Sequence, residues 1–217
     1  MDLHPNLDLL AKIRDRNLDR LEFATAALDA AVQEVYAQKS IKCHPRDLHG
    51  QVLAVNVRDA MFWWTALPTF RRQGFMVEER TSRSLLLIDP EFTKIRLRKH
   101  PRRRRHGVSE LSPVVAIESL DPLHGQLDLF GEQGEVEPLQ WEPALLWDAD
   151  PETQTLRAAW LGALEKDPSN PRVFGRVDIP MGSPSLFSED LAATQKSDPQ
   201  LDFDDLFGEE AAGDFLA

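Results

Sequence analysis

Seven side chains in this sequence have the chemistry to bind a transition metal, but their spacing matches no zinc pattern. They are six histidines and one cysteine: His4, Cys43, His44, His49, His100, His106 and His124. Zinc proteins usually use Cys-x-x-Cys or His-Glu-x-x-His, and neither occurs here. Cys43 with either His44 or His49, and with Asp47, could instead be drawn as a thiol–imidazole pair. A lone cysteine is more often a small buried side chain, so we predict neither a metal site nor a nucleophile.

Asp89, Glu91 and Lys94 are the residue types of a metal-dependent nuclease site. Such a site typically has an aspartate, followed on the next strand by an acid and a lysine one residue apart. Here two residues lie between Glu91 and Lys94, the next strand is basic, and Asp89-Pro90 is typical of a turn. The sequence also lacks a Walker-type loop, Gly-x-Gly-x-x-Gly and Gly-x-Ser-x-Gly. We therefore predict no catalytic site and no cofactor.

The strongest concentration of positive charge lies in residues 94–106. This segment holds eight basic residues and no acid: Lys94, Arg96, Arg98, Lys99, Arg102, Arg103, Arg104 and Arg105. Four successive arginines cannot be buried without partners, so they are solvated or they contact an anion. Nucleic-acid phosphate is an anion that basic segments bind independently of sequence, and nucleic acid is therefore one predicted partner. The alternatives are a solvated hairpin tip and a patch that the acidic tail of the chain covers.

A second candidate for binding is the pentapeptide Gln126-Leu127-Asp128-Leu129-Phe130, which has a glycine on either side. It resembles the motif by which bacterial replication and repair proteins bind the DNA polymerase sliding clamp. The pattern is Gln, Leu, a small or acidic residue, Leu and Phe, and all five positions match. The resemblance implies that Gln126 bonds to the clamp backbone while Leu127, Leu129 and Phe130 fill an apolar pocket. The alternative is that these apolar side chains belong to an edge strand or to the core.

The net charge of −11 is concentrated at the C-terminus. Residues 188–217 hold nine acids against Lys196 alone, a net charge of −8, which leaves −3 for residues 1–187. High charge and few apolar residues predict disorder from about residue 185 onward. Acids interspersed with Leu and Phe, as in residues 200–207, are typical of disordered segments that fold against a partner protein.

Composition favours a cytoplasmic protein. A single cysteine excludes an internal disulfide, and the first residues lack the basic start and apolar core of a secretory signal. The longest apolar runs, such as residues 60–64, are far too short to span a membrane, so we expect no membrane partner. A length of 217 residues is sufficient for one well-packed domain with appendages.

Helical periodicity dominates the chain before residue 75. An apolar stripe predicts one long helix over residues 6–38. The pattern of residues 46–74 predicts a further helical region, in which Asn56 caps a stretch that starts at Val57. Pro68 is expected to open a new turn and Gly74 to end the helix.

Strand periodicity follows from residue 75. Residues 83–88 and 93–99 flank turn residues, and the second segment alternates apolar with basic side chains, which predicts a hairpin with one wet, basic face. A second hairpin is predicted from residues 144–148 and 155–161, and a further strand near residues 114–117. Helices followed by strands predict an α+β fold, with N-terminal helices packed on a mostly antiparallel sheet and a disordered acidic C-terminal tail. The predicted division is residues 1–75, 76–184 and 185–217.

Three functional hypotheses follow from these features. In the first, a non-enzymatic interaction protein docks on the sliding clamp through Gln126–Phe130 and contacts DNA through Lys94–Arg105. That role would suit a regulator of DNA replication or an accessory of a phage or a defence system. In the second, the chain is a nucleic-acid-binding or antitoxin-like regulator whose pentapeptide is only structural. In the third, it is a subunit of a larger assembly in which the acidic tail and the helix with Trp63 and Trp64 contact partners.

Overall fold

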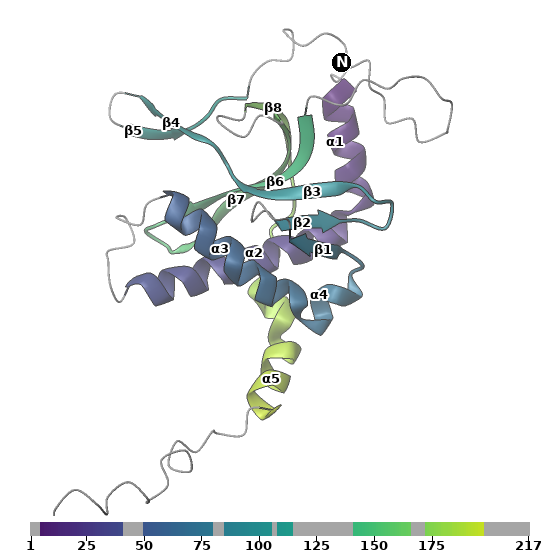
Figure 1. Ribbon diagram of the computed structural model, residues 1–217, viewed down its shortest axis with the longest axis vertical. Coiled ribbons are helices and arrows are strands. Elements are labelled where there is room, and N and C mark those ends of the chain that lie inside the picture. The colour runs from purple at the N-terminus through teal and green to yellow at the C-terminus, as the bar shows by residue number, and fades with distance from the viewer. Residues whose placement is uncertain are drawn as a thin grey trace, which may run out of the picture.

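A computed structural model describes residues 5–40, 50–79, 85–105, 108–114, 141–165 and 172–197 (Figure 1). The pentapeptide Gln126–Phe130 lies outside the described residues, as do residues 198–217 of the predicted acidic tail. None of the described helices combines the length and the apolar character that a membrane span needs.

The N-terminal apolar stripe forms two helices, α1 (Pro5–Arg16) and α2 (Leu18–Ser40), so the prediction of one long helix was wrong. The two helices meet at a sharp angle at Asn17 (Figure 1). The side-chain Nδ2 of Asn17 donates to the Ile13 carbonyl at 3.0 Å and to Asp89 Oδ2 at 2.9 Å. Asparagine competes with the backbone for such hydrogen bonds, and here it ties the helix junction to a distant turn.

The next helices are α3 (Gly50–Ala66) and α4 (Pro68–Arg72). The predicted turn at Pro68 is confirmed, since this proline occupies the first position of α4. Gly74 follows α4 with a φ of 83°, as a glycine that stops a helix requires. The predicted cap at Asn56 was wrong, because Asn56 lies inside α3 and donates to the Val52 carbonyl at 2.7 Å.

The main sheet has six strands in the order β1-β2-β3-β6-β7-β8. The strands are β1 (Met76–Glu79), β2 (Leu85–Ile88), β3 (Lys94–Lys99), β6 (Trp141–Asp150), β7 (Thr155–Glu165) and β8 (Val173–Asp178). All neighbours are antiparallel except β3 and β6, which run parallel. The α+β prediction and both predicted hairpins, β2–β3 and β6–β7, are confirmed. Strand β8 was not predicted. Of the strand expected near residues 114–117, the described part is a single bridge between Val114 and Val173.

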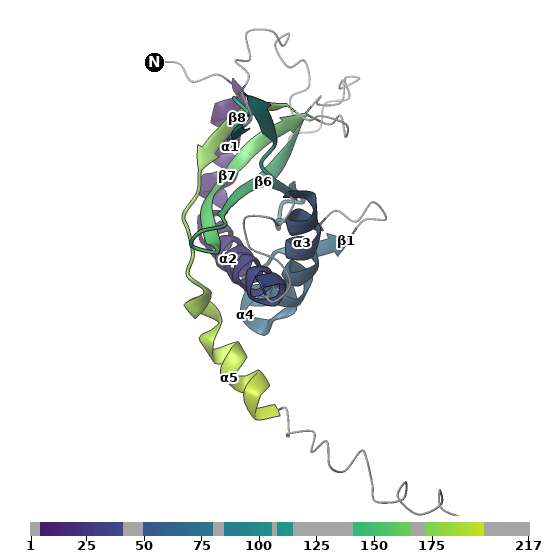
Figure 2. The same cartoon turned by 90° about the vertical axis from the view of Figure 1, so that its left-hand side faces the viewer.

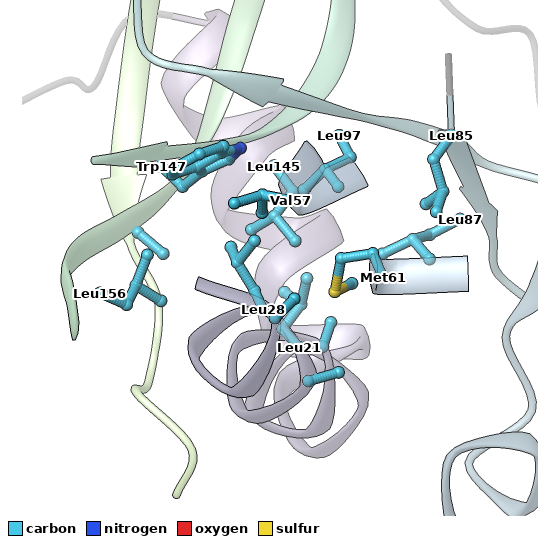
Figure 3. Packing of buried hydrophobic residues seen from close by; sticks show 14 of the residues in the cluster. Leu21, Leu28, Val57, Met61, Leu85, Leu87, Leu97, Leu145, Trp147 and Leu156 are labelled. Atoms are coloured by element: carbon cyan, nitrogen blue, oxygen red, sulfur yellow. The ribbon is translucent and has the colours of Figure 1, made fainter. Parts of the chain in front are cut away.

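One face of the sheet, here called the inner face, packs on the helices. Leu28 of α2 and Val57 and Met61 of α3 gather against Leu97 and Leu145 of the sheet (Figure 3). All five are buried, and burying an aliphatic side chain of this size contributes about 1.5–3 kcal/mol. This shared core fixes β3 and β6, the strands that position the candidate site.

Residues after the sheet form a short 3-10 helix, η3 (Pro184–Phe187), and then α5 (Ser188–Ser197). The prediction of disorder from about residue 185 was therefore wrong for residues 185–197. Phe187 is fully buried and packs edge-on against Phe23 and Trp64, with ring centroids 6.2 and 5.5 Å away. The Thr69 N–H at the start of α4 donates to Asp190 Oδ2 at 2.9 Å. These contacts hold the base of α5, and the rest of the helix projects from the body (Figures 1 and 2).

Candidate nucleic-acid interface

The basic residues of β3 alternate with its core residues, as the sequence predicts. Ile95 and Leu97 are buried among the helices, while Lys94, Arg96 and Arg98 face the other side of the sheet, here called the outer face. The expected wet surface is confirmed only in part, because Lys94 is exposed but Arg96 and Arg98 are half-buried.

Arg96 has an acidic partner on the neighbouring strand. Its Nε lies 2.8 Å from Glu142 Oε1, because the parallel register puts Arg96 beside Ala144 of β6, two residues from Glu142. Among the described residues, neither Lys94 nor Arg98 has an ion pair. These two cations are therefore the ones on β3 that remain available to an external anion.

Lys99 belongs to the inner face rather than to the basic surface. Its Nζ lies 5.4 Å from the ring centroid of Trp147, which suits a cation–π contact. Burial lowers the pKa of Lys99, and the positive charge of Arg102 lowers it further, against the opposing effect of Asp148. Placed in this way, Lys99 is a poor candidate for binding phosphate.

The four successive arginines form a strand of their own, β4 (Arg102–Arg105). This strand pairs antiparallel with β5 (Val108–Leu111) in a separate two-stranded sheet. We call β4 and β5 together the arginine ribbon. Its register sets Arg102 opposite Leu111, Arg103 opposite Glu110 and Arg104 opposite Ser109.

The base of the ribbon is tied to the main sheet by an ion pair. Arg102 Nη2 donates to both oxygens of Asp148, at 2.8 and 2.9 Å, and Asp148 is only 1% exposed. A second guanidinium, that of Arg157, reaches the same carboxylate at 3.6 Å and Asp150 at 3.3 Å. Burial raises the pKa of nearby Tyr36, and the negative charges of Asp148 and Asp150 raise it further. Asp148 was not predicted as part of the site, although an acid inside an apolar strand indicates a buried partner for a cation.

A cluster of His100, Trp160 and Arg176 lies next to the ribbon on the outer face. The Arg176 guanidinium lies 4.5 Å from the Trp160 ring centroid, and the His100 ring packs edge-on at 5.3 Å. Neither residue was predicted to belong to the site. Trp160 was predicted only as part of the strand at residues 155–161, and Arg176 belongs to β8, which was not predicted.

The surroundings of His100 in this cluster favour its neutral form. Burial lowers its pKa, and the neighbouring charge of Arg176 lowers it further, while the hydrogen bond to Pro101 opposes both. The neutral ring donates from Nδ1 to the Pro101 carbonyl at 2.9 Å, so Nε2 is left to accept from Arg176 at 3.3 Å. The imidazole thus holds the start of the ribbon against the sheet.

Asp89, considered above as a nuclease residue, has a structural role that agrees with its interpretation as a turn. It is fully buried and accepts hydrogen bonds from Asn17, from Arg16 at 2.6 Å and from the Thr93 N–H at 2.8 Å. Arg16 also pairs with Glu91. Within the described ranges, no three His, Cys, Asp or Glu side chains gather as a metal site would require.

All eight predicted basic residues lie on described strands, but Arg96 pairs with Glu142 and Lys99 lies on the inner face. The predicted clamp motif lies outside the described residues. A scan against protein-family models and searches of curated proteins and of solved structures found no match.

Proposed function

We propose that this protein docks on the bacterial DNA sliding clamp through Gln126–Phe130 and contacts DNA through its basic segment. The observation that carries the proposal is the pentapeptide itself, in which all five positions agree with the clamp-binding pattern. Apolar anchors that enter a groove of the partner would supply most of the binding energy.

The sheet topology supports this proposal. Strand β3 pairs directly with β6, so no part of residues 115–140 separates these two strands. Between Val114 and Gln126 there are eleven residues, and between Phe130 and Trp141 there are ten. Eleven extended residues span at most about 36–40 Å, and ten span about 33–36 Å. The chain is therefore long enough for the pentapeptide to reach a partner while β3 and β6 stay paired.

A second function, binding to nucleic acid independent of any clamp, is favoured by the basic surface. Lys94 and Arg98 have no ion pair with another described residue, and three more arginines follow on β4. Phosphate contacts of this kind bind without sequence preference. The two functions are compatible, because a clamp that slides on DNA holds its ligands beside the duplex.

The decisive experiment measures binding of the full chain to a purified bacterial sliding clamp. Wild type is compared with Leu129→Ala/Phe130→Ala, which removes two apolar anchors of the motif. We expect micromolar or tighter binding by wild type and at least a tenfold loss in the variant, since deleting one buried anchor typically costs about 2 kcal/mol.

Leu120→Ala/Leu123→Ala is the matched control, because it removes apolar side chains from the same connection but outside the motif. Thermal melting of each variant checks that the fold persists. A free peptide of residues 122–134 should compete for the clamp, whereas a scrambled peptide should not. Absence of clamp binding by wild type would refute this function and leave nucleic-acid binding as the leading one.

A further inference from the structure

We propose that the arginine ribbon is a DNA-binding arm that enters the major groove of a duplex and grips its phosphates. This inference rests on the DNA contact in the proposed function and does not depend on the clamp. It assigns that contact to one element, β4 with β5, and to one kind of nucleic acid.

The shape of the ribbon suits this groove. β4 and β5 pair with each other outside the main sheet, and the ribbon extends away from the helices (Figure 1). The major groove of B-DNA is about 12 Å wide and admits a two-stranded ribbon, whereas the minor groove, at about 6 Å, is too narrow. The major groove is therefore the place on a duplex where the whole ribbon fits.

The ribbon is also braced at its base. Besides the Arg102–Asp148 pair, the Ser112 N–H donates to the Pro101 carbonyl at 2.8 Å, which closes the two strands where they leave the sheet. The His100 N–H donates to the Trp147 carbonyl at 2.7 Å. An isolated two-stranded hairpin is only marginally stable, so these contacts fix the direction of an arm that could not hold it alone.

The charge of the ribbon argues against a purely structural role. Its eight residues contain four arginines and one acid, Glu110, a net charge of +3. Asp148 neutralises Arg102, but residues 103–105 add three positive charges in succession to an arm outside the main sheet. Like charges repel, so this sequence destabilises the arm unless an anion is bound. The phosphate backbones of a DNA duplex, which border the major groove, would supply that anion.

Residue types within β3 and the ribbon favour a duplex over a single strand. Proteins that bind single strands stack the bases on exposed aromatic side chains. Neither β3 nor the ribbon contains Phe, Tyr or Trp. The only aromatic ring between β3 and β4 is that of His100, which is 2% exposed and already packed on Trp160.

The test titrates the full chain with a 20-base-pair DNA duplex at several salt concentrations. Arg103→Gln/Arg104→Gln/Arg105→Gln removes three charges from the ribbon, and Lys12→Gln/Arg71→Gln/Arg72→Gln removes three exposed charges from the helices. The slope of log K against log salt is negative, and each lost phosphate contact reduces its magnitude by about 0.9. The magnitude for the ribbon variant should therefore be about 2.7 smaller than for wild type. We expect its affinity to fall at least tenfold near 0.1 M salt, while the helix variant stays within about twofold of wild type.

A lysine variant of the same three positions should retain most of the binding, because it keeps the charges. Wild type should bind the duplex more tightly than a single strand of equal length and should protect guanine N7, in the major groove, from methylation. If the triple glutamine variant lost its cooperative melt, Arg104→Gln, with an expected slope change of about 0.9, would replace it.

The inference fails if both triple variants lose affinity equally, if the single strand binds as tightly as the duplex, or if guanine N7 stays reactive. Because clamp binding is measured without DNA, the clamp proposal can fail while the ribbon proposal survives, and the reverse also holds.

Discussion

Arg102 and Asp148, which are 46 residues apart in sequence, form an ion pair. One guanidinium nitrogen of Arg102 lies 2.8 and 2.9 Å from the two carboxylate oxygens of Asp148. The carboxylate is 1% exposed, whereas the arginine side chain is 30% exposed. An almost buried acid therefore fixes a cation at the edge of solvent, and it does so where the arginine ribbon leaves the sheet.

Asp148→Asn separates the effect of bracing from the effect of net charge. Removing one negative charge makes the protein more attractive to DNA if charge alone decides. If DNA binding requires the orientation of the ribbon that the Arg102–Asp148 pair fixes, the affinity for the duplex should instead fall several-fold, and we expect this result. The measurement is the same duplex titration, with Asp150→Asn as a control of equal charge change. Tighter binding by Asp148→Asn would contradict the bracing role.

Asp89→Asn should lower the free energy of unfolding by about 3 kcal/mol at pH 7, because it breaks a buried ion pair and leaves Arg16 without its main partner. The new amide would also face the Asn17 amide that now donates to Asp89. Urea unfolding followed by far-UV circular dichroism measures the change. Asp15→Asn, at an exposed acid of α1 next to Arg16, should change stability by less than about 0.5 kcal/mol.

The difference between wild type and Asp89→Asn should also depend on pH. Burial alone would raise the pKa of Asp89, but the hydrogen bonds from Asn17, Thr93 and Arg16 outweigh it and the pKa is lowered below 3.8. A lowered folded-state pKa stabilises the fold above pH 3.8, and this contribution is lost as the pH falls further. The two proteins should therefore converge in stability only in that acid range. A constant difference down to pH 2 would contradict this account.

His100→Gln should make stability less sensitive to pH between 7.5 and 5. Burial lowers the folded-state pKa of His100 below its ordinary value of 6.5, so the unfolded chain takes up the proton first. Stability from this group is complete above pH 6.5 and declines as the pH falls below it. Glutamine can donate to Pro101 and accept from Arg176 but cannot titrate, so thermal melts of the variant should change less over this range. Equal changes in the two proteins would exclude His100 as the source.

Gly182→Ala should loosen the C-terminal segment. A Cβ at this position would lie 2.1 Å from the Glu22 carbonyl oxygen and 2.8 Å from Ala26 Cβ, so the backbone must shift. We expect a loss of about 1–3 kcal/mol, as in other overpacked sites, and a change in tryptophan fluorescence as Phe187 leaves Trp64. Limited proteolysis should then cut before α5. Met181→Ala, at a 44% exposed neighbour, is the control and should behave like wild type.

Local patterns in the sequence predicted the local features of the fold. Alternation along β3, the proline at the start of α4 and the glycine after it each act within a few residues, and each is confirmed. The break at Asn17 was missed, and Asp89, which accepts a hydrogen bond from the Asn17 side chain there, lies 72 residues away. Strand β8 and the parallel pairing of β3 with β6 were also missed, since neither depends on a neighbour in sequence.

In the candidate site, too, local features were predicted and contacts between residues distant in sequence were not. The sequence located the arginines but not their partners, so it could not distinguish Arg96 and Arg102, paired with Glu142 and Asp148, from Arg98. Clamp docking and nucleic-acid binding both stay predictions. Binding of the full chain to a purified clamp and to a DNA duplex tests the two predictions separately.

The parallel pairing of β3 with β6 also bears on how this protein can change. A parallel connection needs only about a dozen residues to return the chain to the start of the next strand. Here the return takes residues 100–140, which are 41 residues, and it contains both the arginine ribbon and the pentapeptide. The sheet therefore does not set the length of this connection, and we expect changes of length within it to leave the six-stranded pairing intact as long as Arg102 still pairs with Asp148.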